Sequence, residues 1–300
     1  MAYIIETRNL HYHYSDGTCA LHGVNLSIPR HSKTAILGPN GAGKSTLFLH
    51  FNGLLQPSSG NLLYSGKNIQ YDRTHLKKLR QRVGLVFQNP DNQLFSASVQ
   101  QDISFGLLNL GYSQEETRLK VNEVGGKLGV QDLFMKPTHF LSTGQKKLIA
   151  LAGVLVMEPE LIICDEPTAG LDQANAQTLM ELMDGLHQNG TSIVISTHDV
   201  NLAYSWASHV ILLNQGQVLA QGKPDEVFSD SSLLAASSLE KPWILESWEY
   251  LQKCGSIASD QPPPTTKEEY FMALSAEPDI FYPGKKVVSF FGARQAKNPG

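Results

Sequence analysis

The residues with the clearest chemical potential form a glycine-rich segment at positions 38–46. They read Gly-Pro-Asn-Gly-Ala-Gly-Lys-Ser-Thr and fill every fixed position of the pattern G-x-x-x-x-G-K-[ST]. The glycines allow a tight turn whose backbone N–H groups converge on an anion. Lys44 supplies a positive charge for the β- and γ-phosphates, and Ser45 supplies a hydroxyl for Mg²⁺. We expect a nucleoside triphosphate site made of Gly38, Pro39, Asn40, Gly41, Ala42, Gly43, Lys44, Ser45 and Thr46.

Two acidic residues follow a continuous apolar run further along the chain. The run covers residues 161–164, and Asp165 and Glu166 come directly after it. Because such a run is typical of a buried strand, both carboxylates would stand at its carboxyl end, where open α/β sheets bind ligands. Asp165 would hold Mg²⁺, directly or through water, and Glu166 would polarise the water that attacks the γ-phosphate. Two solvated acids at a strand end are the alternative, which the phosphate loop disfavours.

A third motif lies upstream of these acids, at residues 141–147 (Leu-Ser-Thr-Gly-Gln-Lys-Lys). Ser142 and Gln145 have the spacing of a capping box, which predicts a helix N-terminus. Capping boxes are common structural features, so the motif in isolation indicates only where a helix begins. A helix N-terminus also attracts anions, and the position upstream of Asp165 favours a functional interpretation.

Length and composition describe an ordinary globular chain. Its 300 residues fit one large or two modest domains, and 41% hydrophobic content suffices for a sizeable core. A net charge of −4 gives no support to a nucleic-acid binder. The three cysteines are far apart and lack metal-ligand spacing, which predicts free thiols in a reducing cytosol. The N-terminus does not resemble a signal peptide, and the longest apolar stretch, 148–157, is too short to span a bilayer.

The elements that must position these motifs alternate between strands and helices. Short strands are expected between residues 4 and 28, broken by a turn at 15–17. Further strands are expected at 34–37, 61–64, 83–87, 161–164 and 192–196, with a hairpin over 210–220, and helices at 46–50, 75–82, 115–128, 141–157 and 174–188. This alternation predicts a mainly parallel, three-layered α/β core with a smaller antiparallel β subdomain.

The residue pattern of the sequence changes after Asp230. Residues 242–254 have the pattern of an amphipathic helix, and three prolines at 262–264 indicate a stiff linker. Thr266 and Glu269 form a second predicted capping box. We expect residues 231–300 to be an appended segment whose last ten or so residues are frayed.

Taken in order, the motifs resemble those of the ATP-binding subunits of ATP-binding-cassette (ABC) transporters. The set comprises the loop at 38–46, Gln88, 141–145, 165–172 and 197–199, within about residues 3–230. The resemblance implies a P-loop NTPase of the ABC ATPase fold, with a parallel-sheet RecA-like core, an antiparallel β subdomain and a helical subdomain at about 90–157. It places the ABC ATP-binding domain at 1–230, with ATP and Mg²⁺ as ligands, followed by a C-terminal extension.

The same resemblance implies roles for single residues. Tyr14 would stack on the adenine, Gln88 would sense Mg²⁺ and the attacking water, and His198 would contact the γ-phosphate. Glu166, His198 and Lys44 would then be the catalytic residues, and Ser45, Gln88 and Asp165 would bind Mg²⁺. Ser142, Gly144 and Gln145 would bind, in trans, the γ-phosphate held by a second copy, and Asp172 would lie in a loop at that dimer interface.

Three positions depart from the pattern of this family. Thr143 and His31 stand where the family usually has glycine, and Leu148 stands where an arginine is common. A Cβ at Thr143 crowds the approach of the partner's nucleotide. A left-handed turn at His31 would cost histidine more than glycine. We expect these differences to affect the efficiency of hydrolysis more than its occurrence.

A narrower resemblance concerns residues 86–95, 102–111 and 198–207. They are similar to the energy-coupling-factor group of ABC ATPases, especially those of cobalt and nickel uptake. The resemblance implies that the segment after Gln88 forms a short helix that touches a transmembrane coupling protein, and that residues 231–300 help two ATPases to pair. No residue is a convincing cobalt ligand, so the ion would be handled by membrane partners.

The expected function is therefore ATP hydrolysis that powers an importer from the cytoplasmic face of the cell membrane, where the chain would be peripheral. Its partners would be a second ABC ATPase subunit, identical or related, a transmembrane coupling protein and a substrate-binding membrane protein, with no nucleic acid. Cobalt is favoured as substrate, and nickel or a vitamin stays open. A non-transport ABC ATPase of translation or DNA repair would usually carry two cassettes or long insertions. A plain P-loop kinase would leave 141–145 and His198 without a function.

Overall fold

The computed structural model describes residues 2–276, and the chain divides into two units, Met1–Lys241 and Pro242–Gly300. The first unit includes α8 (Pro224–Ser229) and α9 (Ser231–Ala236). Leu234 of α9 is buried, and the Asn214 side chain donates to the Ala236 carbonyl at 2.7 Å. The first unit thus continues beyond Asp230, the boundary expected from sequence. The expected frayed end lies outside the described residues.

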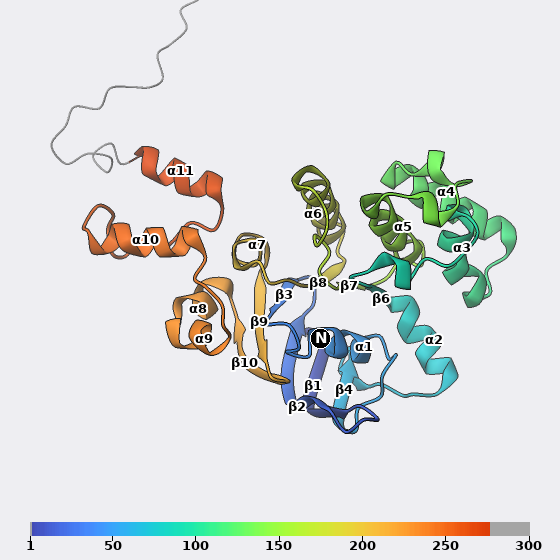
Figure 1. Cartoon of the computed structure of the whole chain (residues 1–300), viewed down its shortest axis with the longest axis horizontal. Helices are drawn as coiled ribbons and strands as arrows, with labels where there is room; N and C mark the ends of the chain where they lie inside the picture. The colour runs from blue at the N-terminus through green and yellow to red at the C-terminus, as the bar shows by residue number, and fades with distance from the viewer. Residues whose placement is uncertain (1, 277–300) are drawn as a thin grey trace, which may run out of the picture. The chain divides into compact units, whose positions relative to one another are not determined.

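A six-stranded sheet forms the core of the first unit (Figure 1). Its strand order is β10-β9-β3-β8-β7-β6, with only β10 antiparallel to its neighbour. The strands are β3 (Lys33–Leu37), β6 (Val83–Val86), β7 (Leu161–Cys164), β8 (Ser192–Ser196), β9 (His209–Asn214) and β10 (Gln217–Gly222). Every residue of β6, β7 and β8 is buried, because both faces of a parallel sheet are covered. The predicted parallel α/β core is confirmed.

A second, antiparallel sheet has the order β2-β1-β4-β5. Its strands are β1 (Tyr3–His13), β2 (Cys19–Pro29), β4 (Ser59–Tyr64) and β5 (Lys67–Asn68). Strands lie on either side of the turn at 15–17, as expected, but β1 and β2 each run for 11 residues and are longer than the short strands predicted. Register shifts, one of them between Thr7 and Leu10, interrupt the alternation of buried and exposed residues. These bulges shorten the runs of regular alternation by which a strand is recognised in a sequence.

The helices divide into two groups. Beside the sheets lie α1 (Lys44–Phe51), α2 (Arg73–Arg82), α6 (Gln173–Gln188) and α7 (Val200–Trp206). Between β6 and β7 the chain forms a helical subdomain of α3 (Val99–Leu110), α4 (Gln114–Leu128) and α5 (Thr143–Leu155), which Figure 1 shows gathered together. This subdomain has an apolar core of its own, centred on Ile103, Val121 and Ile149. No helix of the described residues has the length and apolar character needed to cross a membrane.

His31 occupies a turn between β2 and β3 with φ of 51°, in the left-handed region. That conformation costs a residue with a Cβ about 1 kcal/mol. The imidazole Nδ1 lies 2.7 Å from the Gly190 carbonyl, and the His31 N–H donates to the Ser192 hydroxyl at 2.9 Å. These contacts join the turn to the start of β8, and the imidazole bond, which glycine could not make, offsets part of the backbone strain.

The second unit contains α10 (Trp243–Lys253) and α11 (Lys267–Ala276). Trp248 is buried and packs edge-on against Tyr270, with 5.9 Å between ring centroids. The capping box predicted before α11 is present, because the Glu269 N–H donates to Thr266 Oγ1 and the Thr266 N–H donates to Glu269 Oε2, both at 3.2 Å. Aromatic packing between the two helices therefore gives this short unit its own core.

Candidate nucleotide-binding site

A cleft of about 670 Å³ opens at the carboxyl ends of the parallel strands. The phosphate loop follows β3, Gln88 follows β6, Asp165 and Glu166 follow β7, and His198 follows β8. The cleft is lined by Tyr14, Gly38, Pro39, Asn40, Gly41, Ala42, Gly43, Lys44, Ser45, Thr46, Gln88, Asp165, Glu166 and His198. The carboxyl end of the parallel sheet thus brings together the phosphate loop and His198, which are 160 positions apart, counted from Gly38 to His198 (198 − 38).

The backbone of the phosphate loop requires glycine at two places. Gly38 and Gly43 have φ of 154° and 103°. A Cβ on Gly38 would lie 1.9 Å from the Leu213 carbonyl oxygen, and one on Gly43 would lie 2.8 Å from the Ala20 carbonyl oxygen. Gly43 is also the N-cap of α1 and offers no side-chain cap. The first N–H groups of α1 are therefore available to an anion.

Lys44 is folded back onto the loop that carries it. Its side chain is buried, and the ammonium donates to the Gly38 carbonyl at 2.6 Å and to the Pro39 carbonyl at 3.1 Å. Burial lowers the pKa of Lys44, an effect that the carboxylates of Glu166 and Asp165 oppose. Phosphate oxygens entering the cleft would offer this ammonium charged acceptors in place of two neutral carbonyls.

Ser196, at the end of β8, organises the two acids. Its hydroxyl donates to Asp165 Oδ1 at 2.5 Å and accepts from the Glu166 N–H at 2.8 Å. All three residues are buried, and Glu166 has φ of 45°, a strained conformation for a residue with a side chain. Ser196 was not among the site residues predicted from sequence. The signal available for it was a polar residue that ends a buried strand directly before Thr197 and His198.

Glu166 lines the cleft beside His198. Glu166 Oε2 lies 3.1 Å from His198 Nδ1, and the side chains are 10% and 76% exposed. The carboxylate therefore has one side in the protein and one side toward entering water. This is the placement that a residue activating a water molecule needs.

Tyr14 lies at the rim of the same cleft. Its hydroxyl is 2.9 Å from the Thr46 hydroxyl, and its ring packs edge-on against Tyr12 at 5.0 Å between centroids. Cys19 and Leu239, which the sequence analysis did not select, line the cleft with it. Stacking of Tyr14 on a base stays a prediction.

Four predicted residues do not line the cleft. Ser142 caps α5 through a capping box with Gln145, and Asp172 caps α6 by accepting from the Asn175 N–H at 2.8 Å. A Cβ built on Gly144 would lie 3.6 Å from Asn175 Cγ, so the starts of α5 and α6 are neighbours. Together they form a second polar surface, separate from the cleft.

The donor set of the cleft fits a hard divalent cation. The Ser45 hydroxyl, the Gln88 amide and the Asp165 carboxylate line one cavity with the phosphate loop and present only oxygen ligands suited to Mg²⁺. The arrangement can hold a magnesium–triphosphate complex, with a carboxylate beside it to activate water.

The fold and the cleft together define the ATP-binding-cassette class of ATPases. The family model described as ABC transporter matches residues 21–169. The chain belongs to the energy-coupling factor (ECF) transporter ATP-binding proteins within this class, as its relatives show. The ATP-binding protein EcfA of Methanocaldococcus jannaschii is 47% identical over 255 residues, which is 85% of this chain and 91% of the relative. EcfA2 of Clostridium perfringens is 46% identical over 260 residues, 86% of this chain and 91% of the relative.

Solved structures agree with this assignment. The cbiO1 structure from Clostridium perfringens, described as part of the ABC transporter complex cbiONQ, is 47% identical, with a TM-score of 0.70. The match covers 83% of this chain and 100% of the cbiO1 chain. A dimeric ATP-binding cassette bound to ADP and Pi is 28% identical, with a TM-score of 0.67. This match covers 73% of this chain and 98% of the chain of that cassette. The chain is thus an ATP-binding, ATP-hydrolysing subunit of an ECF-type ABC importer, which confirms the predicted fold and family.

Proposed function

We propose that this chain works as a dimer on the cytoplasmic face of the cell membrane and powers uptake of a transition-metal ion, with cobalt favoured. The proposal of a dimer rests on one observation, namely that the predicted ATP contacts lie on two different surfaces of the chain. The cleft holds the phosphate loop and the acids, whereas Ser142, Gly144 and Gln145 lie on a different surface. A second subunit, identical or related, would bring its copy of that surface to the cleft.

Within the cleft, each side chain has a defined task. Lys44 binds the β- and γ-phosphates, and Ser45, Gln88 and Asp165 hold Mg²⁺, which when bound neutralises charge on the phosphate oxygens. Glu166 accepts hydrogen bonds from the attacking water and orients it toward the γ-phosphate. His198, on the open side of Glu166, donates to a γ-phosphate oxygen. Each contact improves as charge develops on the phosphate, so the set favours hydrolysis.

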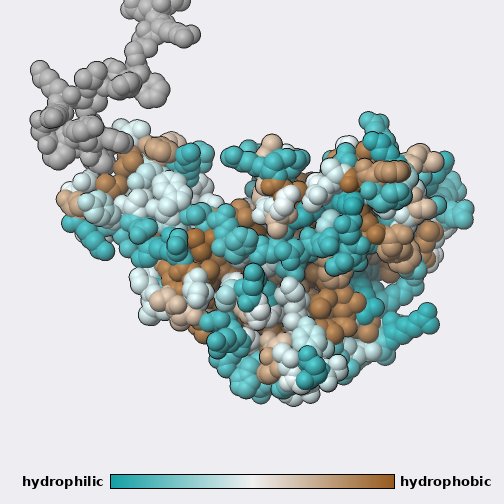
Figure 2. Space-filling view, viewed as in Figure 1, coloured by the Kyte–Doolittle hydropathy of each residue, from teal (hydrophilic) through white to brown (hydrophobic). Residues whose placement is uncertain are grey.

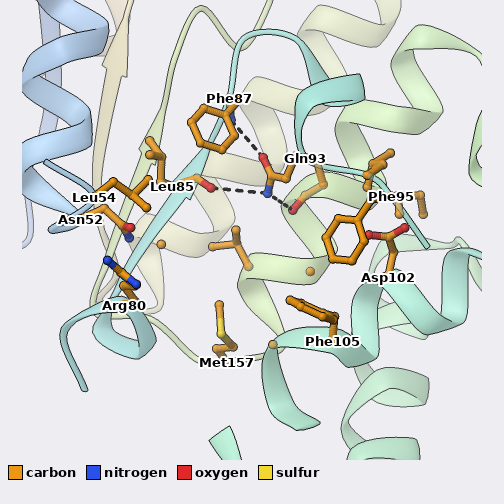
Figure 3. Close-up of a pocket in the computed structure, with 17 residues that line it drawn as sticks. Asn52, Leu54, Arg80, Leu85, Phe87, Gln93, Phe95, Asp102, Phe105 and Met157 are labelled. Carbon is orange, nitrogen blue, oxygen red and sulfur yellow. Dashed lines mark hydrogen bonds between the residues drawn. The ribbon is translucent and has the colours of Figure 1, made fainter. Parts of the chain in front are cut away.

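A pocket between the helical subdomain and the elements around β6 is suited to the membrane partner (Figure 3). It has a volume of about 220 Å³ and is lined by Leu54, Phe87, Phe95, Phe105 and Met157, among others. Phe95 and Phe105 are 65% and 46% exposed and pack edge-on at 4.7 Å between centroids. Figure 2 shows hydrophobic surface over the helical region, interrupted by polar side chains. We propose that an apolar side chain of the transmembrane coupling protein occupies this pocket.

The pocket is joined to the nucleotide cleft by one side chain. Gln93 accepts from the Phe87 N–H at 3.1 Å and donates to the carbonyls of Leu85 and Ala150 at 3.4 and 3.3 Å (Figure 3). Phe87 directly precedes Gln88, which lines the cleft. A partner that displaces the pocket wall therefore acts on the strand end that carries Gln88. The same path operates in reverse when Gln88 responds to ATP.

Support for the substrate comes from the resemblance of residues 86–95, 102–111 and 198–207 to cobalt and nickel uptake ATPases. The solved relative cbiO1 is part of the complex cbiONQ. The proposal is tested by expressing the chain with its membrane partners, captured through a tag on this chain, in cells that lack other cobalt uptake. Uptake of radioactive cobalt that the Glu166→Gln variant abolishes supports the proposal. ATP-dependent uptake of nickel alone, or of a vitamin alone, would contradict the cobalt assignment.

The second unit is proposed to strengthen the dimer. Trp243, Tyr250 and Phe271 expose 41%, 67% and 49% of their surface, so this unit offers aromatic side chains to a partner subunit. A chain ending at Lys241 keeps the first unit whole, including α9. We expect its dimer to be weaker, so that it dissociates at a higher protein concentration than the dimer of the full chain. Sedimentation velocity with and without ATP measures this. Equal self-association of the two chains would contradict the proposal.

A further inference from the structure

Lys147 is a buried lysine that the roles assigned above do not use. It lies in α5, and its side chain is among the buried charged groups, with 5% exposure. Its ammonium donates to three backbone carbonyls, those of Glu166 at 3.1 Å, Pro167 at 2.7 Å and Ala169 at 2.7 Å. An ammonium has three N–H donors, so the bonding capacity of this group is fully used.

The three carbonyls belong to the irregular segment that follows the catalytic strand β7. They converge on one point, and each carries partial negative charge on its oxygen. Such oxygens meet in a buried place only when a cation or donor stands between them, since each would otherwise be desolvated without a partner. Lys147 is that cation. It therefore fixes the path of the backbone from Glu166 to Ala169.

Glu166 is held from both sides by these contacts. Its N–H donates to the Ser196 hydroxyl at 2.8 Å, and its carbonyl accepts from Lys147 at 3.1 Å. Between the two bonds the residue keeps φ of 45°. A strained conformation persists where its surroundings determine it on every side. The direction of the Glu166 carboxylate is consequently set by Ser196 on one flank and by Lys147 on the other.

We propose that Lys147 is a positioning residue for ATP hydrolysis, which orients Glu166 by tying its backbone to α5. The inference rests on the proposed role of Glu166 as the group that activates water. It also gives α5 a second task. The N-cap of α5, Ser142, is expected to face the partner's nucleotide. Lys147, five residues later, positions Glu166 in the site of its own subunit.

The neighbouring lysine is a matched control. Lys146 lies next to Lys147 in α5, but its ammonium contacts Asp91 Oδ1 at 2.7 Å, and the two side chains are 17% and 62% exposed. Successive side chains on a helix point about 100° apart, so the same helix presents one lysine to Asp91 and the other to the carbonyls. Replacement of either residue by methionine removes one ammonium and retains a similar length.

The first experiment measures kcat and ATP affinity in the full-length chain. Lys147→Met is expected to lower kcat at least about tenfold, the factor that corresponds to about 1.4 kcal/mol of barrier, while the Kd for ATP changes less than twofold. Lys146→Met should leave both within twofold. Lys147→Gln keeps an N–H donor and should fall between Lys147→Met and wild type. A kcat near wild type in folded Lys147→Met overturns the proposal, as does a parallel loss of kcat and ATP binding in both Lys147 variants.

The second experiment asks whether Lys147 acts through Glu166. The residual hydrolysis of Glu166→Gln is followed over hours with radiolabelled ATP, with and without Lys147→Met. If Lys147 only orients Glu166, the added substitution should change the residual rate less than about twofold, because the group it positions is already gone. The full loss seen in wild type would overturn the proposal. Turnover of Glu166→Gln at the wild-type rate would instead contradict the assignment of Glu166, whatever Lys147→Met does.

Discussion

Two helices of the first unit begin at motifs that we expect to bind phosphate, and the two N-termini are built differently. The start of α1 has Gly43 as its N-cap, with φ of 103° and no side-chain cap. The start of α5 has Ser142 as its N-cap, and Gln145 completes a capping box with bonds of 3.3 and 3.1 Å. The N–H groups at the start of α1 therefore have no side-chain acceptor. At the start of α5, Ser142 and Gln145 provide side-chain acceptors within the chain.

The difference assigns the two motifs to different stages of binding. The N–H groups at the start of α1 have no side-chain partner, so we expect an anion to supply the missing cap and to bind there first. At α5 the Ser142 oxygen already accepts from the Gln145 N–H, but its hydroxyl proton can still be donated. The start of α5 is therefore stable in a lone subunit and can add one bond to a phosphate that is already held elsewhere.

The largest expected effect separates the glycines of the two helix starts. Gly43→Ala would bring a Cβ to 2.8 Å from the Ala20 carbonyl at positive φ, whereas a Cβ on Gly144 meets only ordinary contacts, the nearest at 3.6 Å. We expect Gly43→Ala to weaken ATP binding by the isolated chain at least about 100-fold, roughly 2.7 kcal/mol. Gly144→Ala should bind ATP within twofold of wild type yet hydrolyse it slowly. Fluorescent-nucleotide titration and a phosphate-release assay measure the two. Equal ATP affinities for both variants would remove the distinction.

A smaller effect tests how firmly core strands hold the acids of the cleft. Ser196→Ala removes the hydroxyl that bonds both Asp165 and the Glu166 N–H. Leaving a buried N–H unpaired costs about 1–3 kcal/mol, so both unfolding free energy and kcat should fall, the latter about tenfold. Ser196→Thr keeps the hydroxyl and serves as the control. Wild-type turnover by Ser196→Ala would show that the two acids need no support from β8.

At the capped helix start, loss of a hydroxyl should act mainly on stability in the lone subunit. Ser142→Ala removes the N-cap of α5, which typically costs about 1 kcal/mol. ATP binding to the phosphate loop should stay within twofold, because Ser142 does not line the cleft. Thermal unfolding of the lone subunit and ATP titration measure the two quantities. A marked loss of ATP affinity would place Ser142 closer to its own subunit's nucleotide than we propose.

The same contrast explains what the sequence could predict. The phosphate loop, the acids after β7 and the helix start at Ser142 each rest on short-range patterns, so their residues and elements were identified. The contacts of Lys147 and Ser196 join elements that pack only in the folded chain, so the partners of these side chains cannot be deduced from local spacing. The left-handed φ of Glu166 is imposed by those contacts. The lengths of β1 and β2 were underestimated because bulges break the alternation that identifies a strand.

The smallest expected effect concerns Thr143, the residue after the N-cap of α5. It is exposed and stands where the family usually has glycine. Thr143→Gly removes a Cβ from the surface that would approach the partner's nucleotide, so hydrolysis should be retained or rise up to about threefold, a change of roughly 0.7 kcal/mol in barrier. Helix stability should fall slightly, by a few tenths of a kcal/mol, because glycine is a poorer helix former than threonine.

Thr143→Ala separates the two causes in this last prediction. Alanine keeps the Cβ and removes the methyl and hydroxyl groups, so it should leave the crowding while improving helix propensity. If the Cβ limits turnover, only the glycine variant gains activity, and the alanine variant gains only melting temperature. A severe loss of hydrolysis in Thr143→Gly would mean that the threonine side chain contributes to the site. The capped helix start would then supply a contact that the family's glycine cannot make.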